Sequence, residues 1–186
     1  MTPVLPFPSR PSGPATWLWI MLIGIASILL SRAFACAMPF AALATLSAFT
    51  LRGREAFALI TFGWFSNQLV GFALLHYPWT PSTLAWGIAI GAAALAGLIA
   101  AREMARRMPL LLWVSIPLVL IAAFMAYELV LYASTSLLPA GPGAFAAPVV
   151  LRIFAINATA IGLLLAVHCA AGALLDRLQK FSPSVP

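Results

Sequence analysis

Long apolar runs, broken only at intervals by charged residues, constrain this fold more than any other feature of the chain. Hydrophobic residues fill 63% of the 186 positions, and charged residues fill only 8%. A soluble globular domain needs far more polar surface than this composition supplies. Because roughly 20 apolar residues in a helix cross a bilayer core about 30 Å thick, the sequence predicts an integral membrane protein.

We expect an all-α membrane protein, a bundle of six transmembrane helices in one domain. The predicted division is a flexible N-terminal tail at residues 1–14, the transmembrane domain at 15–178 and a C-terminal tail at 179–186. Five of the expected helices cover residues 15–30, 56–76, 83–101, 109–133 and 149–175. The remaining helix ends near residue 51 and has Pro39 in its first turn or at a kink.

Basic residues are confined to three segments that alternate with charge-free connectors, and this alternation predicts the orientation. Seven of the ten lie there: Arg52, Arg54, Arg102, Arg106, Arg107, Arg177 and Lys180. Short cytoplasmic loops carry the excess of Lys and Arg. We therefore expect both termini in the cytoplasm of a bacterium, with the protein in its cytoplasmic (inner) membrane. Loop anchoring explains the net charge of +6, so nucleic acid is not an expected partner.

Polar side chains at membrane depth are candidates for function, because burying them unpaired costs several kcal/mol. Helical rise places most of them toward the outer face. The predicted outward-facing pocket comprises Arg32, Cys36, Asn67, Gln68, His76, Tyr77, Trp79, Glu128, Arg152 and Asn157. Flat rings at Tyr77 and Trp79 would suit a large planar ligand.

A structural role is the alternative for several of these residues. Asn67, Gln68 and Asn157 would then hydrogen-bond to neighbouring helices. A pair of Glu128 and Arg152, meeting across the 134–148 loop, would hold that part of the bundle together. His168, beside Cys169, is expected to be a satisfied core histidine.

Known catalytic motifs are absent from the sequence, which holds no phosphate loop, dinucleotide fingerprint, HExxH, CxxC or GxSxG. We expect a transport or binding protein with no intrinsic cofactor rather than an enzyme. An enzyme that uses Cys36, or a pair of Glu128 and His76, is an alternative without supporting residues around it.

Small residues recur every fourth position at Ala33, Ala37 and Ala41, a spacing that lets helices pack closely. A six-helix, alanine-rich protein with a polar site near the outer face resembles the substrate-binding S-components of energy-coupling factor vitamin transporters. The resemblance implies that these alanines dock a transmembrane coupling protein with ATPases. It extends to the solitary vitamin B12 transporters of that fold, which implies that Cys36 ligates the cobalt of a bound cobalamin.

The expected function is therefore vitamin uptake through an outward-facing pocket, with cobalamin or another corrinoid as the substrate. The alternative is a non-catalytic accessory subunit, packed into a larger membrane complex through small-residue helix faces.

Overall fold

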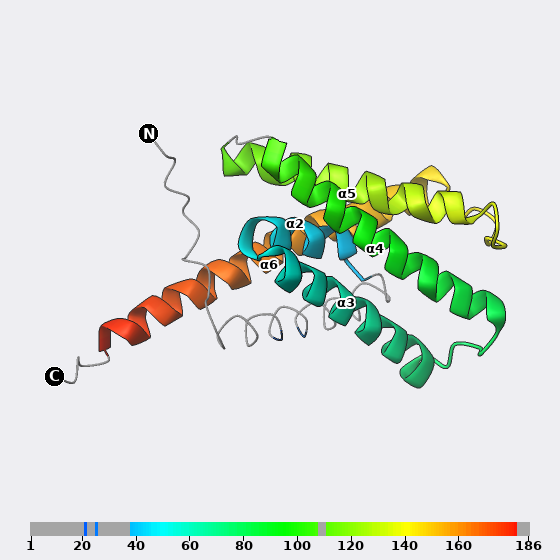
Figure 1. Ribbon diagram of the computed structural model, residues 1–186, viewed down its shortest axis with the longest axis horizontal. Coiled ribbons are helices and arrows are strands. Elements are labelled where there is room, and N and C mark those ends of the chain that lie inside the picture. Colours follow the sequence, from blue (N-terminus) through cyan, green and yellow to red (C-terminus); the bar gives the residue numbers. More distant parts are fainter. Residues whose placement is uncertain (1–20, 22–24, 26–37, 108–110, 182–186) are drawn as a thin grey trace.

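The computed structural model describes residues 21, 25, 38–107 and 111–181, with side chains to residue 170. Every regular element in these ranges is a helix (Figure 1). A π-helical turn, η1, continues α3. In chain order the elements are α2 (Phe40–Thr50), α3 (Gly53–Leu69), η1 (Val70–Leu74), α4 (Pro81–Arg107), α5 (Leu112–Ser134) and α6 (Ala147–Phe181).

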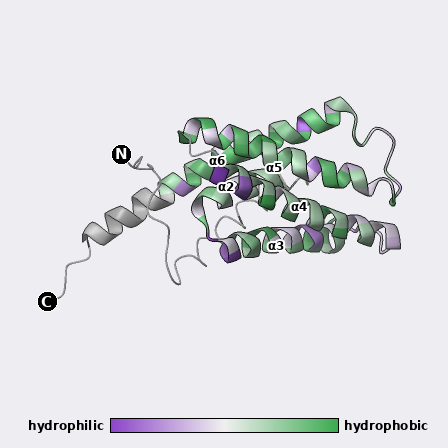
Figure 2. Ribbon diagram, turned by 45° about the horizontal axis from the view of Figure 1, so that its top comes forward, coloured by the Kyte–Doolittle hydropathy of each residue, from purple (hydrophilic) through white to green (hydrophobic). Residues whose placement is uncertain are grey.

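Among the residues that the structure describes, four helices are long and apolar enough to cross a membrane. They are Gly53–Leu74, Pro81–Arg107, Leu112–Ser134 and Ala147–Ala170. Large hydrophobic side chains such as Ile88 and Leu129 are exposed on their outer faces, and hydrophobic colours dominate α4, α5 and α6 in Figure 2. Such a surface suits lipid rather than water. The predicted all-α, multi-pass architecture is confirmed at this level.

The predicted count of six spanning helices is not reproduced within the described residues. α2 has 11 residues, which at 1.5 Å per residue extend about 16 Å and cannot cross a 30 Å core. Most of the helix expected at 15–30 lies outside the described residues. At the other end, α6 continues to Phe181, so residues 179–181 are helical rather than part of a tail.

The short helix α2 forms the centre of the molecule. It contacts α3, α4, α5 and α6, and its side chains at Leu43 and Leu46 are completely enclosed. Apolar residues all around a helix suit burial on every side. The hydroxyl groups within α2 are satisfied locally: Thr45, for example, donates to the carbonyl oxygen of Ala41 at 2.8 Å.

Short connections make α3 to α6 successively antiparallel, so the bundle has two chemically different ends. The basic end holds Arg52, Arg54, Arg102, Arg106 and Arg107. There Arg102 Nη1 donates to the carbonyl oxygen of Leu51 at 3.3 Å, joining α4 to the end of α2.

The opposite, aromatic end holds Tyr77, Trp79, Trp86, Tyr132 and Phe145. Trp86 Nε1 donates to the carbonyl oxygen of Pro139 at 3.1 Å, and the rings of Tyr132 and Phe145 lie 5.5 Å apart, edge to face. Aromatic rings of this kind are typical of membrane interfaces.

Candidate functional site

The N-terminus of α2 lies deep inside the bundle rather than at either end. Its third residue, Ala42, donates its backbone N–H to Asn157 Oδ1 of α6 at 3.1 Å. Asn157 follows the first residue of α6, Ala147, by ten positions, a rise of about 15 Å along the helix. This places the start of α2 roughly halfway along Ala147–Ala170, the part of α6 that is long and apolar enough to cross a membrane. Met38 and Pro39, which directly precede α2, are buried there.

Both polar atoms of the Asn157 side-chain amide form hydrogen bonds within the protein. The first backbone N–H groups of a helix lack partners within that helix, and Asn157 supplies an acceptor for one of them. Its own Nδ2 donates to the carbonyl oxygen of Ile153 at 3.0 Å, and the side chain is only 3% exposed. The alternative role, hydrogen bonding to a neighbouring helix, is therefore confirmed for Asn157.

Two further helices, α3 and α5, meet α2 at this point. The ring of Phe40 stacks on Tyr127 of α5, with centroids 6.0 Å apart and an angle of 28°. A Cβ atom on Gly63 of α3 would lie 3.3 Å from Met38 Cε and 3.9 Å from Phe40 Cε1. We call Met38, Phe40, Gly63, Tyr127 and Asn157 the α2 N-terminal site.

Glu128 follows Tyr127 on α5, and its carboxylate is incompletely satisfied. Its Oε1 atom is buried and has no hydrogen-bond partner. The expected pair with Arg152 is not formed: Arg152 is exposed, and every ion pair among the described residues involves Glu103. Glu128 and Arg152 lie on different helices, and the connection between them does not bring their charges together.

Gln68 belongs to the contact between α3 and α4. A Cβ atom on Gly87 would lie 2.8 Å from Gln68 Oε1, and one on Gly91 would lie 2.8 Å from Trp64 Nε1. Trp64 Nε1 also donates to the carbonyl oxygen of Gly87 at 2.8 Å. Because Gly87 and Gly91 of α4 have no side chains, Gln68 and Trp64 of α3 can pack directly against α4. Asn67, the neighbour of Gln68, is half-buried.

The segment that follows η1 at the aromatic end contains His76, Tyr77 and Trp79. His76 adopts a left-handed conformation with φ of 56°, and Tyr77 then packs so tightly on Gly71 that a Cβ there would lie 2.7 Å from its ring. The ring of Trp79 lies 4.4 Å from that of Phe72. These three residues end a helix, and they are not part of the α2 N-terminal site.

The remaining predicted positions divide into two groups. Arg32, Ala33, Cys36 and Ala37 lie outside the described residues. Ala41 is only 2% exposed inside α2, so this position of the expected docking face is covered by the chain itself.

Two residues that the sequence places side by side on α6 have opposite surroundings. His168 is buried, as expected for a core histidine, whereas Cys169 is an exposed free thiol. No group of three His, Cys, Asp or Glu side chains arranged to hold a metal ion occurs in the described part of the chain.

Sequence reasoning did not single out Phe40 and Tyr127, which form the aromatic wall of the α2 N-terminal site. Pro39 was one available signal, because proline is favoured at the start of a helix. The contact itself joins two residues that are far apart in the sequence, so no local sequence pattern indicates it. No protein-family model, curated protein or solved structure matches the chain, so the functional argument depends on this geometry.

Proposed function

We propose that the chain is a membrane transport protein that takes up a small solute through the α2 N-terminal site. The observation that carries this proposal is a half-length helix that begins near mid-depth in the bundle, next to the α5 turn that holds Glu128. Many transporters bind their solutes at the ends of discontinuous helices near the bilayer midplane. The dipole of α2 makes this end electropositive and would favour an electronegative group of a ligand there.

The chemistry of the site favours a solute with hydrogen-bond donors and a flat apolar surface. A buried carboxylate oxygen without a partner is unfavourable inside a membrane, and a donor on the solute would remove that penalty at Glu128. The stacked rings of Phe40 and Tyr127, the latter next to Glu128 in the sequence, would supply an apolar surface. A vitamin with amide groups on a planar ring system combines both properties.

In the form of the proposal that we favour, the solute is cobalamin or another corrinoid. The thiolate of Cys36 would ligate cobalt, since soft sulfur donors suit such a centre. Cys36 precedes the buried Met38 by two residues, so the chain connects it directly to the α2 N-terminal site. A transmembrane coupling protein with ATPases remains the proposed partner.

The orientation that we propose puts the basic end in the cytoplasm and the aromatic end outside the bacterial inner membrane. It follows from the concentration of arginines at one end of the described bundle. Both chain termini would then be cytoplasmic.

The direct test is an absorption spectrum of the detergent-purified protein with cobalamin and with cobinamide. We expect a shifted corrinoid spectrum that disappears in Cys36→Ala. Affinity should fall about tenfold in Glu128→Gln, because a charge-assisted hydrogen bond is replaced by a neutral one. Thr159→Val, an exposed position on α6, is the matched control and should bind normally.

Two results would count against the proposal. A wild-type protein that binds no corrinoid would remove this substrate. A wild-type protein that is stabilised by no vitamin in a thermal-shift series would overturn solute uptake and favour the accessory subunit.

A further inference from the structure

We propose that Arg52, Arg54 and Arg102 form a binding site at the basic end for the phosphate of an anionic lipid headgroup. This site lies at the other end of α2 from the solute site and does not depend on the transport proposal. A cavity of about 590 Å³ opens at the start of α3, lined by Arg52, Gly53, Arg54 and Glu55. Both arginines are exposed, so the cavity is accessible from the headgroup region.

Arg102 of α4 places a third guanidinium group beside Gly53, one of the residues that line this cavity. Its Nη1 donates to the carbonyl oxygen of Leu51, which fixes the side chain beside the start of α3. A Cβ atom on Gly53 would lie 3.7 Å from Arg102 Nη2. Because Gly53 has no side chain, the guanidinium group of Arg102 can lie close to the backbone of this residue.

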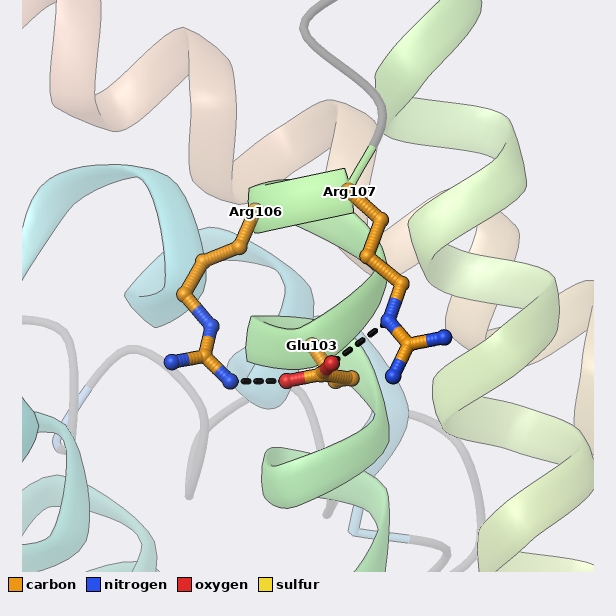
Figure 3. A network of polar contacts seen from close by, with 3 residues as sticks. All are labelled: Glu103, Arg106 and Arg107. Carbon is orange, nitrogen blue, oxygen red and sulfur yellow. Dashed lines mark hydrogen bonds and ion pairs between the residues drawn. The ribbon is translucent and has the colours of Figure 1, made fainter.

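The two acidic residues nearby, Glu55 and Glu103, have other partners than these three guanidinium groups. Glu55 Oε2 accepts the backbone N–H of Arg52 at 2.8 Å. Glu103 is held between Arg106 and Arg107 (Figure 3), with 2.5 Å from its Oε1 to Arg107 Nε. Within the described residues, no carboxylate forms an ion pair with Arg52, Arg54 or Arg102. Two guanidinium groups thus line the cavity and a third lies beside it, and together they outnumber Glu55, the carboxylate in its lining.

Phosphate is the group that this arrangement fits best. Guanidinium groups present a planar fork of donors that matches phosphate oxygens, and the positive end of the α3 dipole adds to the attraction.

A neighbouring aromatic side chain favours a lipid over a soluble anion. Arg54 and Phe57 are three residues apart on α3 and so share a face. Phe57 is 53% exposed, and it lies farther into the spanning segment than Arg54. An acyl chain attached to a phosphate at the cavity would run along this ring.

The test compares lipid retention by the full-length protein in native mass spectrometry, using mixed micelles of phosphatidylglycerol and phosphatidylcholine. We expect wild type to prefer phosphatidylglycerol. The double variant R52Q/R54Q should lose about tenfold or more of this preference, because each basic residue near the membrane surface attracts anionic headgroups. The control R106Q/R107Q removes the same charge from arginines paired with Glu103 and should change the preference less than about twofold.

Three outcomes would overturn the proposal: an unchanged preference in R52Q/R54Q, an equal loss in R106Q/R107Q, or full displacement of phosphatidylglycerol by millimolar inorganic phosphate. The last would assign the cavity to a soluble anion. Size-exclusion profiles confirm that each variant is folded. If R52Q/R54Q does not fold, R102Q alone replaces it, with a loss of about threefold or more expected and an unchanged preference counting against the site.

Discussion

Asn157 and Glu128 show how two polar side chains in the same bundle can have opposite roles. The amide of Asn157 both accepts and donates, so the protein itself uses the whole side chain. Oε1 of Glu128 accepts nothing. The sequence places both at membrane depth but does not separate them, because the partner of Asn157 is a backbone N–H on another helix. Only the folded arrangement shows which of the two side chains has a polar atom without a hydrogen-bond partner.

Replacing Asn157 by Leu should destabilise the protein without any ligand present. The substitution keeps the approximate volume but leaves the N–H of Ala42 buried without its acceptor, at a cost of about 1–2 kcal/mol. The expected result is a lower melting temperature in detergent. Thr159→Val on the same helix is the control, since Thr159 bonds only to its own helix at Ala155. Equal melting temperatures for wild type and Asn157→Leu would contradict the capping role.

His76 is predicted to matter through its backbone rather than its imidazole. Its φ of 56° lies in the left-handed region, where glycine is unstrained and β-branched residues are strongly disfavoured. His76→Gly should therefore be as stable as wild type. His76→Ile should lose about 1–2 kcal/mol, measured as a lower melting temperature. If His76→Gly instead abolishes solute binding while remaining stable, the imidazole itself is a ligand.

At the level of elements, the boundaries of α2 were the hardest to predict. Leu51, its C-cap, agrees with the expected end of the second helix, because the charged segment at residues 52–55 marks it. The sequence alone did not decide where α2 begins, because Pro39 is compatible with either a first turn or a kink. Pro39 directly precedes the helix, which supports the first alternative. The enclosure of α2 by four other helices depends on tertiary packing and has no counterpart in local sequence.

The contact between α3 and α4 predicts different sensitivities at two glycines of the same helix. At Gly91 a new Cβ would press on the rigid indole of Trp64, whereas at Gly87 it would meet only the flexible end of Gln68. We expect Gly91→Ala to lower the melting temperature clearly and Gly87→Ala to lower it little. Gly162→Ala, where a Cβ meets nothing within 4 Å, should be neutral or stabilising by up to about 1 kcal/mol. Similar losses at Gly87 and Gly91 would refute this packing.

For the whole molecule, composition and charge predicted more than motifs did. Helical class and multiple spans follow from apolar run length, and the two ends of the bundle follow from where Arg52 and Arg102 fall in the chain. The residues of the predicted pocket lie in more than one place: Asn157 reaches the α2 N-terminal site, whereas Tyr77 and Trp79 lie at the aromatic end. Helical rise gives depth along one helix, but the direction of a side chain around the bundle axis depends on packing.

The proposed orientation predicts which single cysteines react from outside the cell. In a chain with Cys36 and Cys169 replaced by serine, Ala140→Cys, in the exposed connector at the aromatic end, should be labelled by a membrane-impermeant maleimide in intact cells. Arg54→Cys, at the basic end, should react only after the membrane is permeabilised. The reverse pattern would invert the proposed topology.

The cap on α2 also has a consequence for biosynthesis. Ala42 and Asn157 are separated by 115 residues, so a ribosome adding about 5–20 residues per second completes the cap roughly 6–23 s after it has made α2. Until then, the nascent chain contains a short apolar helix that cannot span the bilayer and in which the N–H of Ala42 lacks its acceptor. A chain that terminates before α6 keeps this defect permanently, and we expect membrane proteases to degrade it faster than the full-length protein.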